Sequence, residues 1–288
     1  SKYSEKFIKG EIKLFLYKKI KFKKYPNWFK ASDTDFSSSK HKHWSRISTF
    51  KHGDIKYIWE ISRFKWLPVL VKSYTETKDT KYLNYMNLIL INWNQNNPPN
   101  AGPNWKCAQE VSIRLLNFII SLKLLNETNN LSEDAKRFIF VHCQRIAATL
   151  KYAKSQKNNH SISEAAALYL GGIILEKLDP YKDDGTKYLN IGKKSLEEDA
   201  VNLIMKDGTF SQYSTNYQRY VIDIFSIIEI WNISDKRNKF SDSYYESVKS
   251  SILWLFYFTD SISGRAPNIG ANDGTLFYDF GFNDYLDY

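Results

Sequence analysis

Cysteine is scarce in this sequence, and the spacings that hold structural metals are missing. Only Cys107 and Cys143 occur in 288 residues, and both fall within apolar helical patterns. Two buried free thiols are therefore a better interpretation than a disulfide or a metal site. Of the five histidines, only His41 and His43 suggest a ligand pair. We expect no metal cofactor.

Several other signals are missing as well. No run of apolar residues reaches the length that crosses a membrane, and no signal peptide precedes the charged start SKYSEK. Neither a phosphate-binding loop nor a dinucleotide fingerprint is present. These absences predict a protein without a membrane span and without a nucleotide or redox cofactor, and they leave its compartment open.

Apolar and aromatic side chains are plentiful. A hydrophobic content of 43% over 288 residues is enough for one large domain spanning 1–288, in which 264–288 is a loop-rich closing or linker segment. Aromatic residues make up 16%, more than a core of Leu, Ile and Val would need. Flat rings in a groove suit sugar faces or nucleic-acid bases, although ordinary packing accounts for most of them.

The net charge of +10 favours polyanionic partners, because a positive groove concentrates an anionic polymer. Nucleic acid and acidic polysaccharide both qualify. The lysines are spread from the N-terminus to Lys249, so a generally solvated basic surface is an equally good interpretation.

The spacing of apolar residues predicts an all-α fold. Apolar residues recur at helical intervals, as in Val111, Leu115 and Phe118, and strand-like alternation is rare. Nine or so helices joined by short loops follow from this periodicity. Their expected ranges are 4–21, 54–77, 80–95, 105–126, 132–154, 160–177, 185–206, 213–233 and 241–259.

The stretch KNNHSISEAAALYLGG begins a helix with polar side chains and then turns apolar at once. Asn158 or Asn159 can cap the helix, His160 lies in its first turn, and Glu164 shares the face of His160 and can pair with it. A helix start offers free amide groups and a positive dipole end, which favour an anion. A capped helix with a packing histidine is the alternative. The small residues that follow allow a neighbouring helix to pack closely.

A second segment, KDGTFSQYSTNYQRYVIDIF, places three tyrosines near the start of a helix. Spacings of four and three put Tyr213, Tyr217 and Tyr220 near one side, with Arg219 among them. A boundary stripe of tyrosines is one interpretation. The other is that one phenol acts as an acid or base, for which a nearby cation must lower its pKa from about 10.

A third segment, GPNWKCAQEVSIRLLNF, follows a loop rich in turn formers. Asn104 and Trp105 stand at its helix start, and Trp105 could serve as a sugar platform. Glu110 and Arg114 have the spacing of an intrahelical pair, which is usually structural. A second loop of this kind, GRAPNIGANDGT, contains Asn272. Loops held on a helical frame often carry function.

Taken together, these segments resemble the N-terminal domain of the heparinase II/III-like polysaccharide lyases, a group that also takes in alginate and oligoalginate lyases. Five segments appear in the family's order over about 220 residues, which makes the signal fairly specific. They are DIKYIWEISRF at 54, NPPNAGPNWKCAQEVSIR at 97, NNHSISEAAAL at 158, DGTFSQYSTNYQRY at 207 and PNIGANDGT at 267.

The resemblance implies an incomplete (α/α) toroid with a cleft, followed in full-length members by a β-sandwich, which we expect to be absent from this chain. It also implies β-elimination on a uronic acid, with Asn159, His160 and Tyr217 as catalytic groups and a further histidine from the sandwich. A periplasmic or secreted location is favoured by the same resemblance. The predicted substrate-binding residues are Asn104, Trp105, Arg114, Glu164, Tyr213, Arg219 and Asn272.

Two alternatives stand beside the lyase hypothesis. A non-catalytic toroid associated with polysaccharide biosynthesis or modification would bind an acidic glycan without cleaving it. A basic helical protein that binds nucleic acid is favoured by the charge alone, but no helix carries a concentrated lysine and arginine face. We therefore expect acidic polysaccharide, and not nucleic acid, as the partner.

Overall fold

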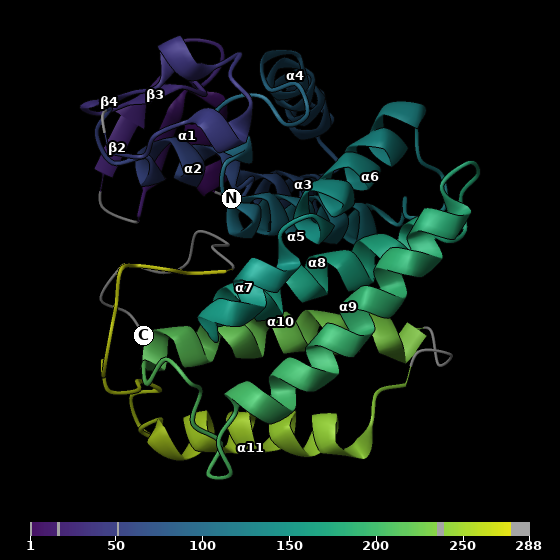
Figure 1. Cartoon of the computed structure of the whole chain (residues 1–288). Coiled ribbons are helices and arrows are strands. Elements are labelled where there is room, and N and C mark those ends of the chain that lie inside the picture. Colours follow the sequence, from purple (N-terminus) through teal and green to yellow (C-terminus); the bar gives the residue numbers. More distant parts are fainter. Residues whose placement is uncertain (1, 16–17, 51, 235–238, 278–288) are drawn as a thin grey trace. The chain divides into compact units, whose positions relative to one another are not determined.

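The computed structural model describes residues 2–15, 18–50, 52–234 and 239–277, which form two compact units (Figure 1). The first unit holds the described residues up to Leu131, and the second unit holds those from Ser132. The single domain expected over 1–288 stays a prediction. Residues 278–288 of the expected closing segment lie outside the described residues.

The first unit begins with a short helix and a hairpin, so the helix predicted over 4–21 is wrong. Helix α1 (Lys2–Ile8) is followed by the antiparallel strands β1 (Glu11–Leu14) and β2 (Lys18–Lys21). Gly10 breaks the helix with φ +82, and a Cβ there would meet the Phe22 backbone oxygen at 2.0 Å. Buried and outward residues alternate along β1, which is a strand period too short to detect in the sequence.

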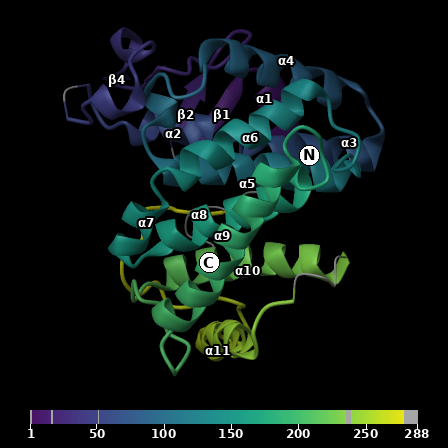
Figure 2. The ribbon, with the colours of Figure 1, turned by 45° about the vertical axis from the view of Figure 1, so that its right-hand side comes forward.

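Helices α2 (Lys56–Ser62) and α3 (Trp66–Thr77) were expected as one helix over 54–77. Phe64 separates them with φ 62, a left-handed conformation that ends a helix. Between the hairpin and α2 lie β3 (Lys30–Ala31), β4 (Thr34–Asp35), and the short 3-10 helices η1 (Ser37–Ser39) and η2 (Trp44–Arg46). Figure 2 shows β1 beside α1 and α2.

The core of the first unit is built on α5 (Ala108–Leu125), which packs on α3. Every residue from Ala108 to Ser121 is buried, as expected for a central helix that is covered on all sides. Helix α4 (Lys81–Asn96) packs on α3, and the 3-10 helix η3 (Pro103–Trp105) leads into α5. Helices α4 and α5 confirm the predictions at 80–95 and 105–126.

A buried ion network ties α2 to α5. Arg63 donates from Nε and Nη2 to the two carboxylate oxygens of Glu110, at 2.6 and 2.8 Å, and from Nη1 to Glu60 at 2.5 Å. Lys65 adds a contact of 3.0 Å to Glu60. Burial raises the pKa of Glu60, but Lys65 and Arg63 more than offset this, so the pKa stays below its ordinary value. Glu60 and Arg63 therefore have a structural role in this unit.

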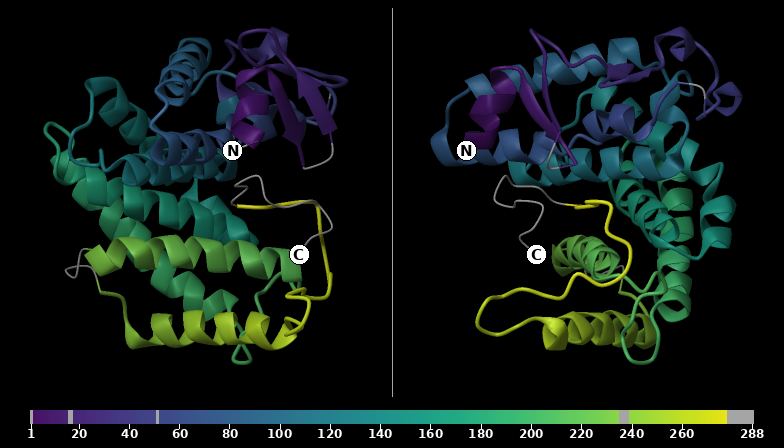
Figure 3. Two further views of the ribbon diagram at one scale, coloured as in Figure 1. Left: turned by 180° about the vertical axis from the view of Figure 1, so that it is seen from behind. Right: turned by 90° about the vertical axis from the view of Figure 1, so that its left-hand side faces the viewer.

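The second unit is a set of packed helices (Figure 3). Ser132 caps the first of them by accepting from the Ala135 amide at 3.3 Å. The helix expected over 132–154 is broken in two at Ala148 and Thr149. The helices are α6 (Glu133–Ala147), α7 (Leu150–Gln156), α8 (Asn159–Leu175), α9 (Lys182–Leu203), α10 (Thr215–Ser234) and α11 (Asp242–Phe258).

Helices α8 and α9 approach closely through glycine. A Cβ on Gly172 would meet the Leu189 backbone nitrogen at 2.3 Å, and one on Gly192 would meet that of Tyr169 at 2.4 Å. The close packing expected after the polar start of α8 is confirmed. Because α9 covers it and α6, α7 and α10 also contact it, α8 is the central helix of this unit.

Candidate active site

The polar start of α8 is fixed by hydrogen bonds within the second unit. Asn158 is the cap, because its side chain accepts from the His160 amide at 3.0 Å. The Asn159 amide donates to Gln212 Oε1 at 2.9 Å. The first amides of the helix therefore have internal partners, which corrects the expectation that they are free for an anion. What remains at this end is the helix dipole and the side chains.

His160 is the one residue of α8 that is not buried. Asn159 is 5% exposed, and every residue from Ser161 to Leu175 is buried, whereas His160 is half-buried. A packing histidine would share the burial of its neighbours. The imidazole instead marks the point at which this central helix reaches the surface.

Helix α10 begins at the same end as α8. Ser163 Oγ lies 3.1 Å from the Tyr220 hydroxyl, and both side chains are buried. His160 stands one turn before Ser163, and Tyr217 stands one turn before Tyr220. The bond from the Asn159 amide to Gln212, three residues ahead of α10, joins the two starts again. The structure thus brings the predicted catalytic residues to neighbouring helix ends.

Tyr217 is half-buried and donates its hydroxyl to Asp273 Oδ2 at 3.0 Å. Its ring also packs against that of Tyr220, with centroids 6.5 Å apart. Asp273 was not among the predicted site residues, although it lies in the loop that the sequence singled out. Its position in an Asn-Asp-Gly turn beside Asn272 was the available signal.

The loop that carries Asp273 is held on the start of α10. Ser214 Oγ donates to the Ala271 carbonyl at 2.5 Å, and the Thr215 amide donates to the Ile269 carbonyl at 3.0 Å. Gly270 has φ +77, and a Cβ there would meet the Tyr213 backbone oxygen at 2.1 Å. Only glycine fits this close approach.

Asn272 holds the same loop in shape. Its side chain donates to Asn268 Oδ1 at 3.0 Å and accepts from the Gly274 amide at 3.0 Å. It is half-buried and lies next to Asp273. The structure therefore shows Asn272 in a turn-forming role, and its predicted contact with substrate stays a prediction.

Glu164 points into the packed part of α8 rather than toward a ligand. It is 3% exposed, and its Oε2 has no hydrogen-bond partner among the described residues. Burial raises the pKa of Glu164 to about 8, and the charge of Arg145 partly offsets this. The structure shows no bond between Glu164 and His160, and so little exposure does not suit the predicted substrate contact.

Two further residues that were predicted to bind substrate lie on either side of Tyr217 in the sequence. Tyr213 is 65% exposed, with φ 50, just ahead of α10. Arg219 is half-buried, and its charge acts on Asp223, one turn later. Burial raises the pKa of Asp223 to about 7, and Arg219 partly offsets this. These residues place one cation and one exposed phenol near the start of α10.

The predicted residues of the first unit form a closed cluster. Arg114 is fully buried, with its guanidinium 4.5 Å from the ring of Trp93 and 5.3 Å from that of Trp105. It donates to the carbonyls of Asn104 at 3.1 Å and Ser62 at 3.3 Å. Asn104 and Trp105 are 0% and 1% exposed. The sugar-platform and substrate-binding roles predicted for these residues do not fit such burial.

Predictions about metal-binding groups, membrane-spanning helices and thiols were made on separate grounds. They contain no group of three or more histidine, cysteine or acidic side chains placed to hold a metal ion. Within the same residues, no helix is both long enough and apolar enough to cross a membrane. Cys143 is buried and Cys107 half-buried, and both are free thiols.

The comparison with known families decides the relationship. The family described as Heparinase II/III N-terminus matches residues 7–268. This chain belongs to that family. A heparin-sulfate lyase from Bacteroides thetaiotaomicron is 25% identical to it over 216 residues, which is 73% of this chain and 30% of the relative.

Solved structures of heparinases share the fold of this chain. The heparan sulfate lyase HepC from Pedobacter heparinus aligns with a TM-score of 0.60 at 18% identity, over 92% of this chain and 39% of its own. A heparinase III aligns with a TM-score of 0.58 at 22% identity, over 75% and 33%. The predicted fold class, an all-α incomplete toroid, is confirmed. The chain spans between 30% and 39% of these relatives.

Proposed function

We propose that this chain is the helical part of a polysaccharide lyase that cleaves an acidic, uronate-containing polysaccharide by β-elimination. Family membership and the lyases among its relatives support this, and the net charge of +10 suits an anionic substrate. One observation carries the assignment of the site. His160, the one residue of α8 that is not buried, stands at the same helix end as Tyr217.

The first step of the reaction is removal of the proton at C5 of the uronate. That carbon acid is weak, so the site must stabilise the negative charge that develops on the substrate carboxylate. The imidazole of His160 is the group assigned to this task. The side-chain amide of Asn159 was predicted to share it, but at 5% exposed it is nearly as buried as Glu164, so its role stays a prediction. The dipole of α8 adds positive potential at the same end, although its first amides are already bonded.

The second step breaks the bond between C4 and the glycosidic oxygen. A double bond forms between C4 and C5, and the departing oxygen needs a proton. Tyr217 is assigned to this exchange: as a phenolate it takes the C5 proton, and as the resulting phenol it gives that proton to the departing oxygen. Its hydroxyl donates to Asp273 in the free structure, so this bond must break and the phenol must lose its proton to solvent before the reaction begins. The elimination is redox-neutral and leaves an unsaturated sugar end.

A panel of uronate polymers tests the proposal. Incubation with the 288-residue chain, and with the full product of its natural reading frame, should generate ultraviolet-absorbing unsaturated ends. We expect His160→Ala to slow product formation at least about 100-fold, the usual cost of removing a group that stabilises developing negative charge. Undiminished product formation by that variant would remove His160 from the site.

A second candidate function is binding of acidic glycan without cleavage. It is favoured by the net charge of +10, which suits an anionic glycan whether or not the glycan is cleaved. The family resemblance also implies a further catalytic histidine in the β-sandwich of full-length members. Salt-sensitive binding of a uronate polymer, with no unsaturated product from either protein form, would support this alternative over the lyase.

A further inference from the structure

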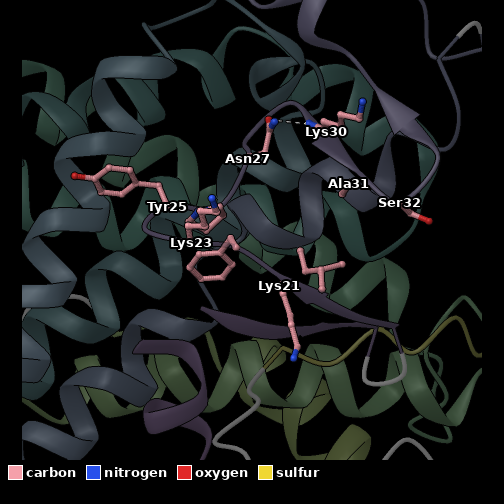
Figure 4. Close-up of a pocket in the computed structure, with 10 residues that line it drawn as sticks. Lys21, Lys23, Tyr25, Asn27, Lys30, Ala31 and Ser32 are labelled. Carbon is pink, nitrogen blue, oxygen red and sulfur yellow. Dashed lines mark hydrogen bonds between the residues drawn. The ribbon is translucent and has the colours of Figure 1, made fainter. Parts of the chain in front are cut away.

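A basic surface lies in the first unit, between the end of β2 and β3. It is a pocket of about 510 Å³, shown in Figure 4. Lys21, Lys23 and Lys30 line it, and no acidic residue is among the described residues that do so. None of the predicted catalytic or substrate-binding residues belongs to it.

The lysines of this pocket keep donors for a ligand. Lys21 pairs with Glu11 at 3.3 Å, and Lys30 pairs with Asp35 at 3.3 Å, but all four side chains are at least 44% exposed. Exposed pairs of this kind are weak and exchange readily with other partners. Lys23 makes no ion pair with any described residue. An anion can therefore bind without breaking a buried interaction.

The strand beside the pocket concentrates positive charge further. Five of the seven residues from Lys18 to Lys24 are lysine, and none is acidic. In the hairpin register, Lys13 stands directly opposite Lys19. Like charges placed opposite each other on a sheet destabilise it. The strand therefore presents a dense run of positive charge next to the pocket.

Two aromatic rings line the pocket beside the lysines, and the turn of the pocket is fixed by hydrogen bonds. Phe22 and Tyr25 are half-buried beside the lysines. Asn27 Oδ1 accepts from the backbone amides of Phe29 at 3.0 Å and Lys30 at 3.1 Å, which holds the turn that carries Lys30 (Figure 4). Rings beside cations suit a sugar ring with anionic substituents. Nucleic-acid bases instead need freely exposed rings for stacking.

We propose that this pocket is an accessory site that binds the sulfate or carboxylate groups of an acidic polysaccharide. The choice of glycan over nucleic acid rests in part on the proposed function, whereas the site itself rests on the pocket. It differs from the catalytic assignment in its residues and in its chemistry, since it holds anionic groups and transforms nothing.

Charge removal tests the site directly. The triple variant Lys21→Gln, Lys23→Gln, Lys30→Gln is compared with a control triple, Lys182→Gln, Lys187→Gln, Lys249→Gln, whose lysines are exposed in the second unit. Both carry His160→Ala so that the probe, heparin, stays intact. At low salt we expect the pocket variant to bind heparin about tenfold more weakly and the control to change less than about twofold, because each exposed charge contributes modestly. Equal losses in the two variants overturn the proposal.

A footprint on the unmutated chain makes the result independent of folding of the variant. Acetylation of lysines, read by mass spectrometry, should be reduced at Lys21, Lys23 and Lys30 when heparin is bound, and unchanged at Lys187 and Lys249. Unprotected pocket lysines overturn the site. Single-stranded DNA that displaces heparin at an equal or lower concentration overturns the assignment to a glycan.

The test of the accessory site can fail or succeed independently of the test of lyase activity. The pocket variant, with His160 intact, should form unsaturated product from a short uronate oligosaccharide at the rate of the unmutated chain. Binding that depends on the pocket lysines, with no product from any substrate, would refute the lyase and keep the accessory site. Product without such binding would do the reverse.

Discussion

The starts of α5 and α8 look alike in sequence and differ in the structure. Each follows a loop rich in asparagine, places an asparagine and an aromatic or imidazole ring at the helix start, and then turns apolar. In α5, Asn104 and Trp105 are at most 1% exposed and pack on Arg114. In α8, His160 is half-buried, whereas the residues after it are buried. Polar residues at two similar helix starts therefore differ in burial, and His160 is the partly exposed residue on which the proposed site rests.

The largest expected effect is the loss of activity in Tyr217→Phe, which changes a residue at the start of α10, beside the start of α8. Loss of the hydroxyl removes the proposed proton donor, so we expect product formation to fall by at least about 100-fold. The midpoint of urea unfolding should stay nearly unchanged, because the lost bond to Asp273 is exposed. The matched control is Tyr213→Phe, whose ring is 65% exposed. Equal losses in both variants would contradict the assignment of Tyr217.

At the start of α5 we expect a substitution to reduce stability and not catalysis. Arg114→Ala leaves the carbonyls of Asn104 and Ser62 without their donor and opens a cavity against two indole rings. We expect the free energy of unfolding to fall by about 3 kcal/mol, measured by urea titration. The exposed Arg137→Ala should cost less than about 0.5 kcal/mol. A stable Arg114→Ala protein with lost activity would return this residue to the site.

Glu164 makes the stability of the second unit depend on pH. Its pKa is raised from 4.5 to about 8 by burial, so the folded state holds a proton that the unfolded state loses. Stability should therefore fall as pH rises from about 5 to 8, by up to about 1.4 kcal/mol per pH unit. Glu164→Gln should flatten that slope, and the exposed Glu127→Gln should not. Unfolding curves recorded at several pH values measure both, and an unchanged slope in Glu164→Gln would show that the carboxyl is ionised when folded.

The smallest effect is expected at the loop that covers α10. Asp273→Asn keeps the shape of the acceptor of the Tyr217 hydroxyl and removes its charge. Because a single exposed hydrogen bond contributes modestly, we expect activity to change by about threefold, with unfolding unaffected. Asp33→Asn, at an exposed position of the first unit, is the control for loss of one charge. A loss as large as that of Tyr217→Phe would place Asp273 itself among the catalytic groups.

The long helices could be predicted from the sequence because their apolar period is sustained. The predictions around α5, α8 and α10 agree with the structure to within a few residues. The hairpin of β1 and β2 could not be predicted from the sequence, because an alternation of only four residues cannot be distinguished from helical spacing. The break at Phe64 carries no glycine or proline signal, since a left-handed aromatic residue is imposed by its packing.

The candidate site could be predicted only in part. The cap at Asn158 and the close packing of α8 are local properties and follow from residue type. Burial of Trp105 and Arg114 depends on contacts with Trp93, far along the chain, which no local pattern reveals. Asp273 was missed for the same reason, because its bond to Tyr217 joins residues 56 positions apart.

The most direct test is a double-variant measurement of unsaturated product on the preferred uronate polymer. If His160 and Tyr217 act as one unit, the protein carrying both His160→Ala and Tyr217→Phe should be about as slow as the slower single variant, since groups that act together do not lose activity additively. If the fold-losses of the two single variants multiply in the double variant, or if the double variant is as fast as the unmutated chain, a shared site at the starts of α8 and α10 is contradicted.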